Sequence, residues 1–134
     1  MRSTRVSWQE KLNKVQDWKV VDGGKRFAGT MLVPTPRQID ALVKEIPKGA
    51  VSSPKMLRRT LAQRFGAETT CPLCTGIFLR IAAEAAIEQR SEGIAEVTPY
   101  WRVVDEKGRH NPKLPGGETD QAALLKNDLA ELGW

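Results

Sequence analysis

The chain has 134 residues, of which 40% are hydrophobic and 28% charged, and its formal net charge is +5. This length favours one globular domain, and no apolar run approaches the about 20 residues that a membrane-spanning helix requires. The basic N-terminus lacks a following apolar stretch, so we expect no signal peptide. Two cysteines do not make a disulfide framework, and we expect a cytoplasmic protein with no membrane partner.

Positive charge is concentrated in the middle of the sequence. Six basic residues lie between positions 44 and 64, where Glu45 is the single acid. Residues 118–134 instead hold four acids and one lysine. This asymmetry favours an anionic partner at the central segment, although a solvated basic helix face would have the same composition.

The first 34 residues are predicted to form a helix and a β-hairpin. Ser7 followed by Glu10 has the pattern of a capping box, which predicts a helix over about 7–17. Residues 18–21 and 26–33 then have the composition of strands around a turn at Asp22-Gly23-Gly24. We therefore divide the chain into an N-terminal extension, 1–34, and a main domain, 35–134.

Three helices are predicted between residues 35 and 89. Thr35-Pro36 and Ser53-Pro54 each place a good capping residue before a proline, which is favoured at the first helical position. A longer helix is predicted from Cys71-Pro72 to about Gln89. The apolar spacing predicts the buried faces of the three helices: Ile39, Leu42, Val43 and Ile46; Leu57, Leu61 and Phe65; and Ile77, Phe78, Ile81, Ala82 and Ala85.

The second and third of these helices are joined by a few residues around Gly66, which is typical of a helix-turn-helix. In such a motif the N-terminal residues of the second helix enter a DNA groove. The β-branched residues Val103 and Val104 predict a strand over 102–104, which would form a wing together with the turn over 105–108. Thr119 is predicted to cap a last helix with an apolar side made of Ala122, Leu125, Leu129 and Leu132.

The segment Pro99-Tyr100-Trp101-Arg102 places two aromatic rings beside a permanent cation. This combination suits a flat ligand such as a nucleobase. Aromatic residues also pack frequently in protein cores, so the alternative is that Tyr100 and Trp101 are core residues.

Several short motifs follow one another along the chain in a recognisable order. They are Ile46-Pro47-Lys48-Gly49-Ala50-Val51, Pro99, Arg102-Val103-Val104, Gly108-Arg109, Leu114-Pro115-Gly116, Gln121, Leu124-Leu125 and Asp128. Together these motifs resemble the DNA-binding domain of alkylguanine-DNA alkyltransferases. The resemblance covers about residues 35–133, and the part from Gly108 onward is most similar to alkyltransferase-like proteins, which are non-enzymatic relatives that bind alkylated guanine and recruit repair.

The resemblance implies an α+β fold, a winged helix-turn-helix that binds DNA through the minor groove and flips a damaged base into a pocket. The acceptor cysteine of that family corresponds to Tyr100 and its histidine to Trp101, so neither a thiolate acceptor nor an activating base is present there. The family's nucleotide-rotating tyrosine falls near Pro54. Its arginine finger falls near Leu73, where an apolar wedge can also hold an unstacked step open.

We therefore expect a monomeric, non-enzymatic protein that binds double-stranded DNA, recognises alkylated guanine and has a repair-protein partner, without cofactor or metal. Lys55, Arg58 and Arg59 are predicted to contact phosphates. The residues predicted to approach the groove are Thr69, Thr70, Leu73 and Thr75. The predicted base pocket consists of Tyr100, Trp101 and Arg102. A degenerate fold retained for protein interaction is an alternative, in which Tyr100 and Trp101 would be buried.

Cys71-Pro72-Leu73-Cys74 has a different chemistry. A Cys-x-x-Cys at a helix N-terminus has a lowered thiol pKa, as in disulfide oxidoreductases. A thioredoxin-like fold would place a strand before this motif, where we predict a helix and a turn. A zinc site would need four ligands, and His110 is the one histidine in the chain. Ordinary packing thiols, a redox or reactive pair, a metal site and a relocated alkyl acceptor stay open, and packing thiols are the first expectation.

Overall fold

A computed structural model describes residues 7–14, 16–22, 29–105, 107–110, 114–115 and 117–133, with residues 117 and 118 described by their backbone alone. The fold is α+β, as predicted. It contains the helices α1 (Trp8–Asn13), α2 (Pro36–Lys44), α3 (Pro54–Arg64), α4 (Pro72–Ser91) and α5 (Gly117–Glu131), the strands β1 (Lys19–Asp22), β2 (Thr30–Val33) and β3 (Thr69–Thr70), and the 3-10 turn η1 (Tyr100–Arg102).

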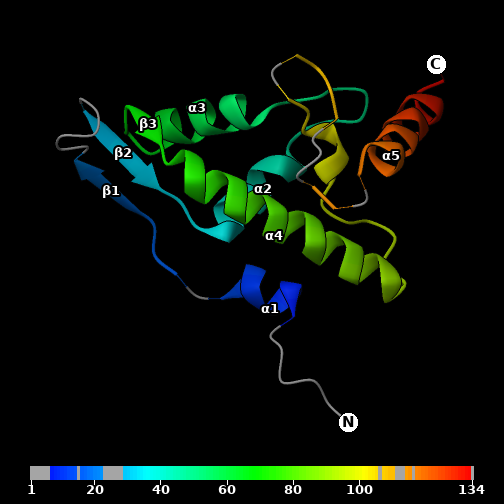
Figure 1. The fold of residues 1–134 in the computed structure, drawn as a ribbon, viewed down its shortest axis with the longest axis horizontal. Helices are drawn as coiled ribbons and strands as arrows, with labels where there is room; N and C mark the ends of the chain where they lie inside the picture. Colours follow the sequence, from blue (N-terminus) through cyan, green and yellow to red (C-terminus); the bar gives the residue numbers. More distant parts are fainter. Residues whose placement is uncertain are drawn as a thin grey trace, which may run out of the picture.

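The strands form one small sheet in the order β1-β2-β3 at one end of the molecule (Figure 1). β1 and β2 are antiparallel, whereas β2 and β3 are parallel, with Met31 beside Thr69. The predicted turn at Gly23-Gly24 lies outside the described residues. Because β3 follows residue 35, the N-terminal hairpin and the predicted main domain share this sheet. The helix α1 is also attached, since its Leu12 packs with Ala82 and Ala85 of α4.

The predicted helix starts are confirmed where a capping side chain precedes proline. Thr35 accepts a hydrogen bond from the Gln38 N–H, and the Gln38 side chain accepts one from the Thr35 N–H, so the capping box is complete. Ser53 accepts from the Met56 N–H at the start of α3. Ser7 caps α1, but this helix ends at Asn13, four residues earlier than predicted.

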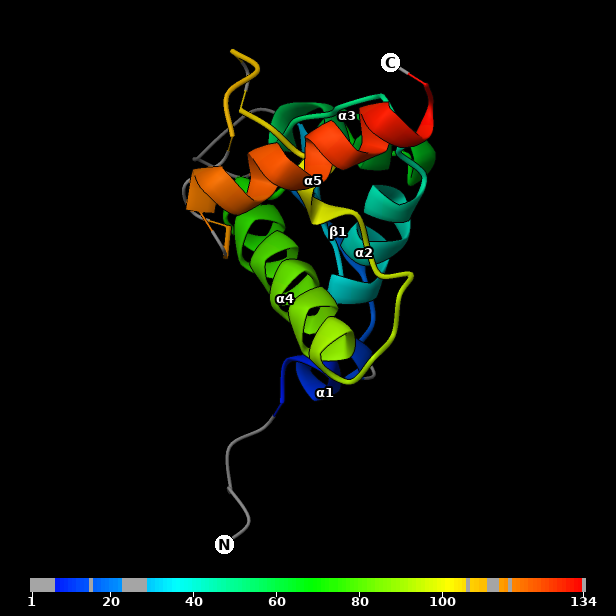
Figure 2. The same cartoon turned by 90° about the vertical axis from the view of Figure 1, so that its right-hand side faces the viewer.

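The main core lies between α2, α3, α4 and η1. The predicted stripe of α2, from Ile39 to Ile46, is buried together with Leu57 and Leu61. For α4 the predicted face is partly wrong, because Ile77 is half exposed while Leu79 is buried. The buried residues of α4 follow one helical stripe: Thr75, Leu79, Ala82, Ala83, Ala85 and Ala86. Figure 2 shows α4 below α5, which crosses over it at the same end of the molecule as η1.

The predicted strand over 102–104 is wrong. Pro99 fixes the backbone before a 3-10 turn, in which the Arg102 N–H donates to the Pro99 carbonyl (3.1 Å). Val103 and Val104 form only single bridges, to Ser52 and His110. The turn after Asp105 is present, but in the described part of the chain it does not join two strands into a wing.

The helix α5 also differs from its prediction. It begins at Gly117, two residues before Thr119. Leu129 and Leu132 are exposed, whereas Gln121 and Asp128 are buried. Among the described residues, no helix has the length and apolar character needed to cross a membrane.

Candidate nucleic-acid interface

Three cations gather on the outer side of α3. Lys55, Arg58 and Arg59 lie at i, i+3 and i+4, and therefore on one side of the helix, while Leu57 and Leu61 face the core. We call these three cations the α3 basic face. Together with Thr69 they line a hollow of about 340 Å³, in which Glu68 is the one acidic lining residue.

Among the described residues, no acidic side chain forms an ion pair with the α3 basic face. Arg64, at the end of the same helix, behaves differently, because its guanidinium forms two hydrogen bonds to Glu45 (2.7 and 2.6 Å). This pairing lowers the pKa of Glu45 and raises that of Arg64. The positive potential of α3 is thus greatest at Lys55, Arg58 and Arg59.

Two of the threonines predicted to approach DNA are buried instead. The Thr70 hydroxyl donates to the carbonyl of Arg58 (2.7 Å), and the Thr75 hydroxyl donates to the carbonyl of Cys71 (2.8 Å). Because both side chains are fully buried, the prediction that they contact DNA is corrected. They hold α3 and the start of α4 in place. Thr69 is half-buried and does line the hollow beside α3.

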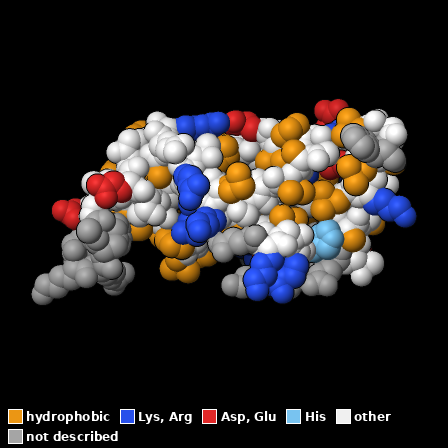
Figure 3. All heavy atoms as spheres, turned by 90° about the horizontal axis from the view of Figure 1, so that it is seen from above, with side chains coloured by type: hydrophobic (Ala, Val, Ile, Leu, Met, Phe, Trp, Pro, Cys, Tyr) orange, Lys and Arg blue, Asp and Glu red, His pale blue; other side chains and the backbone are white. Residues whose placement is uncertain are grey.

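Exposed apolar side chains are also present on α3 and in the first turns of α4. Leu73, in the first turn of α4, is 71% exposed, and Ile77 one turn later is 50% exposed. Met56 on α3 is 56% exposed. Figure 3, which views the molecule from the side of α3 and α5, shows separate groups of basic side chains among hydrophobic ones. Cations mixed with apolar groups can contact both the phosphates and the sugars or base edges of a nucleic acid.

The turn after η1 adds two cations that the sequence analysis did not assign to DNA binding. Pro54, Asp105, Lys107 and Arg109 line a shallow hollow of about 220 Å³ beside the start of α3. The Asp105 carboxylate accepts hydrogen bonds from the N–H groups of Lys107 and Arg109 and from the Arg109 side chain, and these bonds lower its pKa. The sequence signal for this hollow was the Gly108-Arg109 pair, which belongs to the family resemblance.

The residues of the predicted base pocket are buried, and Trp101 and Arg102 belong to a buried polar network. Tyr100, Trp101 and Arg102 are at most 7% exposed. The Asp128 carboxylate accepts from the Trp101 ring N–H (2.9 Å) and from two nitrogens of Arg102 (2.7 and 2.9 Å), which lowers the pKa of Asp128. A further nitrogen of Arg102 donates to the carbonyl of Ile46 (2.7 Å). Burial raises the pKa of the Tyr100 hydroxyl.

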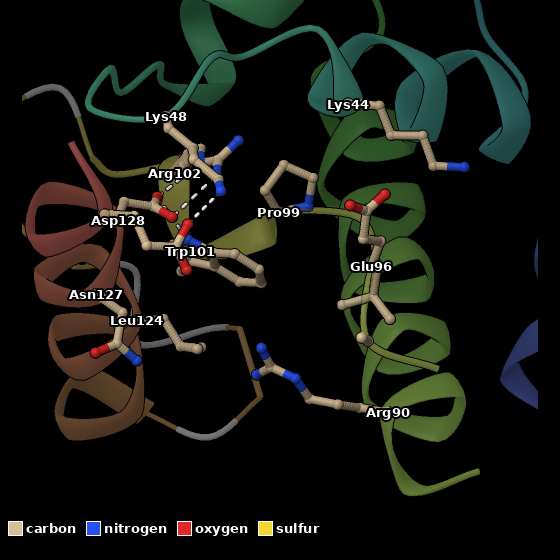
Figure 4. A pocket seen from close by; sticks show the side chains of 13 residues that line it. Lys44, Lys48, Arg90, Glu96, Pro99, Trp101, Arg102, Leu124, Asn127 and Asp128 are labelled. Atoms are coloured by element: carbon tan, nitrogen blue, oxygen red, sulfur yellow. Dashed lines mark hydrogen bonds and ion pairs between the residues drawn. The ribbon is translucent and has the colours of Figure 1, made fainter. Parts of the chain in front are cut away.

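A cavity of about 710 Å³ lies beside this network, between α2, α5 and the end of α4. Trp101 and Arg102 line it, while Tyr100 is not among its lining residues. Figure 4 shows Arg90 extending from α4 toward the Trp101 ring, and its guanidinium carbon is 5.5 Å from the ring centre. Lys48 also lines the cavity and is paired with Glu131. The lining of the cavity is of mixed charge, because the acids Glu96, Asp128 and Glu131 lie among its cations.

The predicted base pocket and the predicted wedge are not brought together. Leu73 lies at the start of α4, whereas Arg90 lies 17 residues later, beside the cavity. At 1.5 Å per residue the two positions are about 25 Å apart along the helix. A base unstacked at Leu73 is therefore too far away to enter the cavity next to Trp101.

The cysteines lie at the start of α4, next to Leu73. Cys71 is the N-cap and Cys74 is in the first turn, and both are free and half-buried. Contrary to the prediction, a strand does precede the motif, namely the two-residue β3. The described residues hold no cluster of three or more His, Cys, Asp or Glu side chains that is suited to a metal ion.

Comparisons with known proteins do not decide between these possibilities. No family model matches the sequence, and neither the curated proteins nor the solved structures give a match. The resemblance to alkyltransferase-like proteins thus stays a prediction, and the placement of the charged and apolar side chains carries the functional proposal.

Proposed function

We propose that this protein binds duplex DNA without acting on it chemically, and that the α3 basic face contacts the phosphates. The observation that supports this proposal is the gathering around one hollow of three cations that form no ion pair within the described part of the chain. Contacts of this kind do not depend on base sequence, so the binding is general and falls steeply as salt displaces the protein from the phosphates.

The first turn of α4 supplies the second contact. Leu73 and Ile77 project from the same side of α4, within a few residues of Thr69 in the hollow. Large exposed apolar side chains beside a basic surface are suited to sugars and base edges, and such a side chain can also insert at a base step. In this arrangement Leu73 contacts a groove while the α3 basic face holds the adjacent backbone.

The family resemblance and the geometry of the structure lead to different predictions for the binding of alkylated guanine. The resemblance predicts tighter binding to an alkylated duplex. The geometry predicts equal binding, because Tyr100 is buried and because Arg90, the residue of α4 that lines the cavity, is about 25 Å from Leu73 along the helix. Burial of Tyr100 and Trp101 also fits the alternative of a protein-interaction module, which predicts that the α3 basic face is dispensable.

Fluorescence anisotropy with two labelled duplexes, one plain and one with a single O6-alkylguanine, tests the proposal over a salt series. We expect equal affinities for the two duplexes and a steep loss of affinity with salt. Tighter binding to the modified duplex would instead support lesion recognition and make Tyr100 and Trp101 the next residues to change. No binding of either duplex at low salt would refute the DNA-binding proposal.

A further inference from the structure

The two cysteines occupy positions in α4 that bring their side chains together. Cys71 is the N-cap and Cys74 the third helical residue, which is the residue that an N-cap side chain normally reaches. The Cys74 N–H donates to the Cys71 sulfur (3.3 Å), in the way that it would to a capping hydroxyl. The Cys71 backbone is not helical (φ −53°, ψ 116°), and this hydrogen bond places its side chain over the first turn, toward Cys74.

The two sulfurs also differ in their surroundings. Burial, together with a hydrogen bond to the Cys71 side chain, raises the pKa of Cys74 to about 11. Cys74 is therefore a protonated thiol at neutral pH. The Cys71 sulfur receives the backbone hydrogen bond at the positive end of a 20-residue helix. One sulfur is thus placed to react first and the other to follow.

From this juxtaposition we infer that Cys71 and Cys74 form a dithiol site that is oxidised to an intramolecular disulfide by a small-molecule disulfide such as glutathione disulfide. The reaction does not require DNA, although the site adjoins Leu73 in the proposed DNA-binding surface. Neither cysteine is fully buried, and Leu73 between them projects into solvent, so a small disulfide can approach. A disulfide requires its two Cβ atoms to lie about 3.5–4.5 Å apart, and residues three apart on one side of a helical turn need only a small adjustment to reach this range.

The reaction consists of two exchanges. The Cys71 thiolate attacks one sulfur of glutathione disulfide, the sulfur–sulfur bond breaks, and one glutathione leaves as the thiolate and takes up a proton. Cys74 then loses its proton to solvent and attacks the Cys71 sulfur of the mixed disulfide, which releases the second glutathione. The protein loses two electrons and two protons, and glutathione disulfide is reduced to two molecules of glutathione.

The test uses the whole chain without DNA, equilibrated anaerobically in mixtures of reduced and oxidised glutathione. Free thiols are blocked by alkylation after an acid quench, and intact masses are measured. We expect a species two hydrogens lighter than the reduced chain that has lost both alkylation sites, with a single two-electron transition in which a tenfold change in the equilibrium corresponds to about 30 mV.

Two variants identify the order of the exchanges. In Cys74→Ser the reaction should stop at a mixed disulfide of Cys71 with glutathione. In Cys71→Ser, where serine retains the helix cap, Cys74 should be modified more slowly than Cys71 is in the first variant. Separate glutathionylation of both cysteines in the wild-type chain without an intramolecular disulfide would overturn the inference, and so would a disulfide that forms only between two chains. Circular dichroism of each species checks that the fold is retained.

Discussion

Replacing Arg58 and Arg59 by glutamine tests whether the α3 basic face holds DNA. Each phosphate that a protein cation neutralises contributes about −0.9 to the slope of log affinity against log salt. Three contacts give a slope of about −2.7, so affinity falls about 40-fold between 50 and 200 mM salt. With Lys55 alone the slope becomes about −0.9, and the same change in salt lowers affinity only about 3.5-fold. Anisotropy titrations at several salt concentrations measure both slopes.

A second double variant separates position from net charge. Arg37 and Lys126 are exposed on α2 and α5 and do not line the hollow, and their replacement by glutamine removes the same two charges. We expect this control to keep the slope near −2.7, as given by about 0.9 for each phosphate contact. Equal reductions in both double variants would mean that overall charge drives binding. An unchanged slope in Arg58→Gln/Arg59→Gln would refute the placement of phosphates on α3.

Three further predictions concern single residues. Leu73→Ala should weaken DNA binding by about 1 kcal/mol, or about fivefold, in anisotropy titrations. The thermal unfolding temperature should stay unchanged because Leu73 is exposed, and an equal loss of folding stability would contradict a role in DNA contact. Asp128→Asn should destabilise the fold by about 3–5 kcal/mol in urea unfolding, because it leaves Arg102 buried with no charged partner. Hydrogen bonds from Arg102 lower the pKa of Asp128 below its ordinary value of 3.8. The stabilisation from this pair is therefore present above pH 3.8 and is lost as the pH falls through the lowered pKa. This part of the pH dependence of folding stability should be absent in Asp128→Asn. Thr35→Ala should lower the free energy of unfolding, measured with urea, by about 1 kcal/mol, because it breaks the capping box with Gln38. Thr35→Ser keeps a capping hydroxyl and should retain most of the wild-type stability.

The parts of the fold that local chemistry determines could be predicted from sequence. A cap followed by proline located the starts of α2 and α3, because both residues act on the first turn of their own helix. The apolar spacing of α2 gave its buried stripe for the same reason. On α4 the prediction placed Ile77 in the core and did not include Leu79, which is the buried residue. An alanine-rich helix has several apolar sides, and its packing partners determine which of them is buried.

The parts that depend on distant residues could not be predicted. Asp128 is buried on α5 because it pairs with Arg102, which lies 26 positions earlier in the chain. Apolar periodicity does not include this partner and therefore predicted that leucines form the buried side of α5. The β propensity of Val103 and Val104 was outweighed by the turn that follows Pro99. In the candidate interface, the outward placement of Lys55 and Arg59 followed from helical spacing. Hydrogen bonding to nearby carbonyls turned the hydroxyls of Thr70 and Thr75 inward, which residue type alone does not reveal.

The parallel pairing of β2 with β3 has a consequence for how the chain folds. Met31 pairs with Thr69, which lies 38 positions later in the chain (69 − 31 = 38), and both α2 and α3 lie between them in the sequence. The carbonyls of Thr30 and Leu32 accept hydrogen bonds from the N–H groups of Glu68 and Cys71. During synthesis β2 therefore has no partner on this side until residue 71 has left the ribosome, and closing so long a loop is slow compared with forming the helices within it. We expect the sheet to close late, so that the junction between α3 and α4, where the α3 basic face and Cys71 meet, is among the last regions of the molecule to be completed.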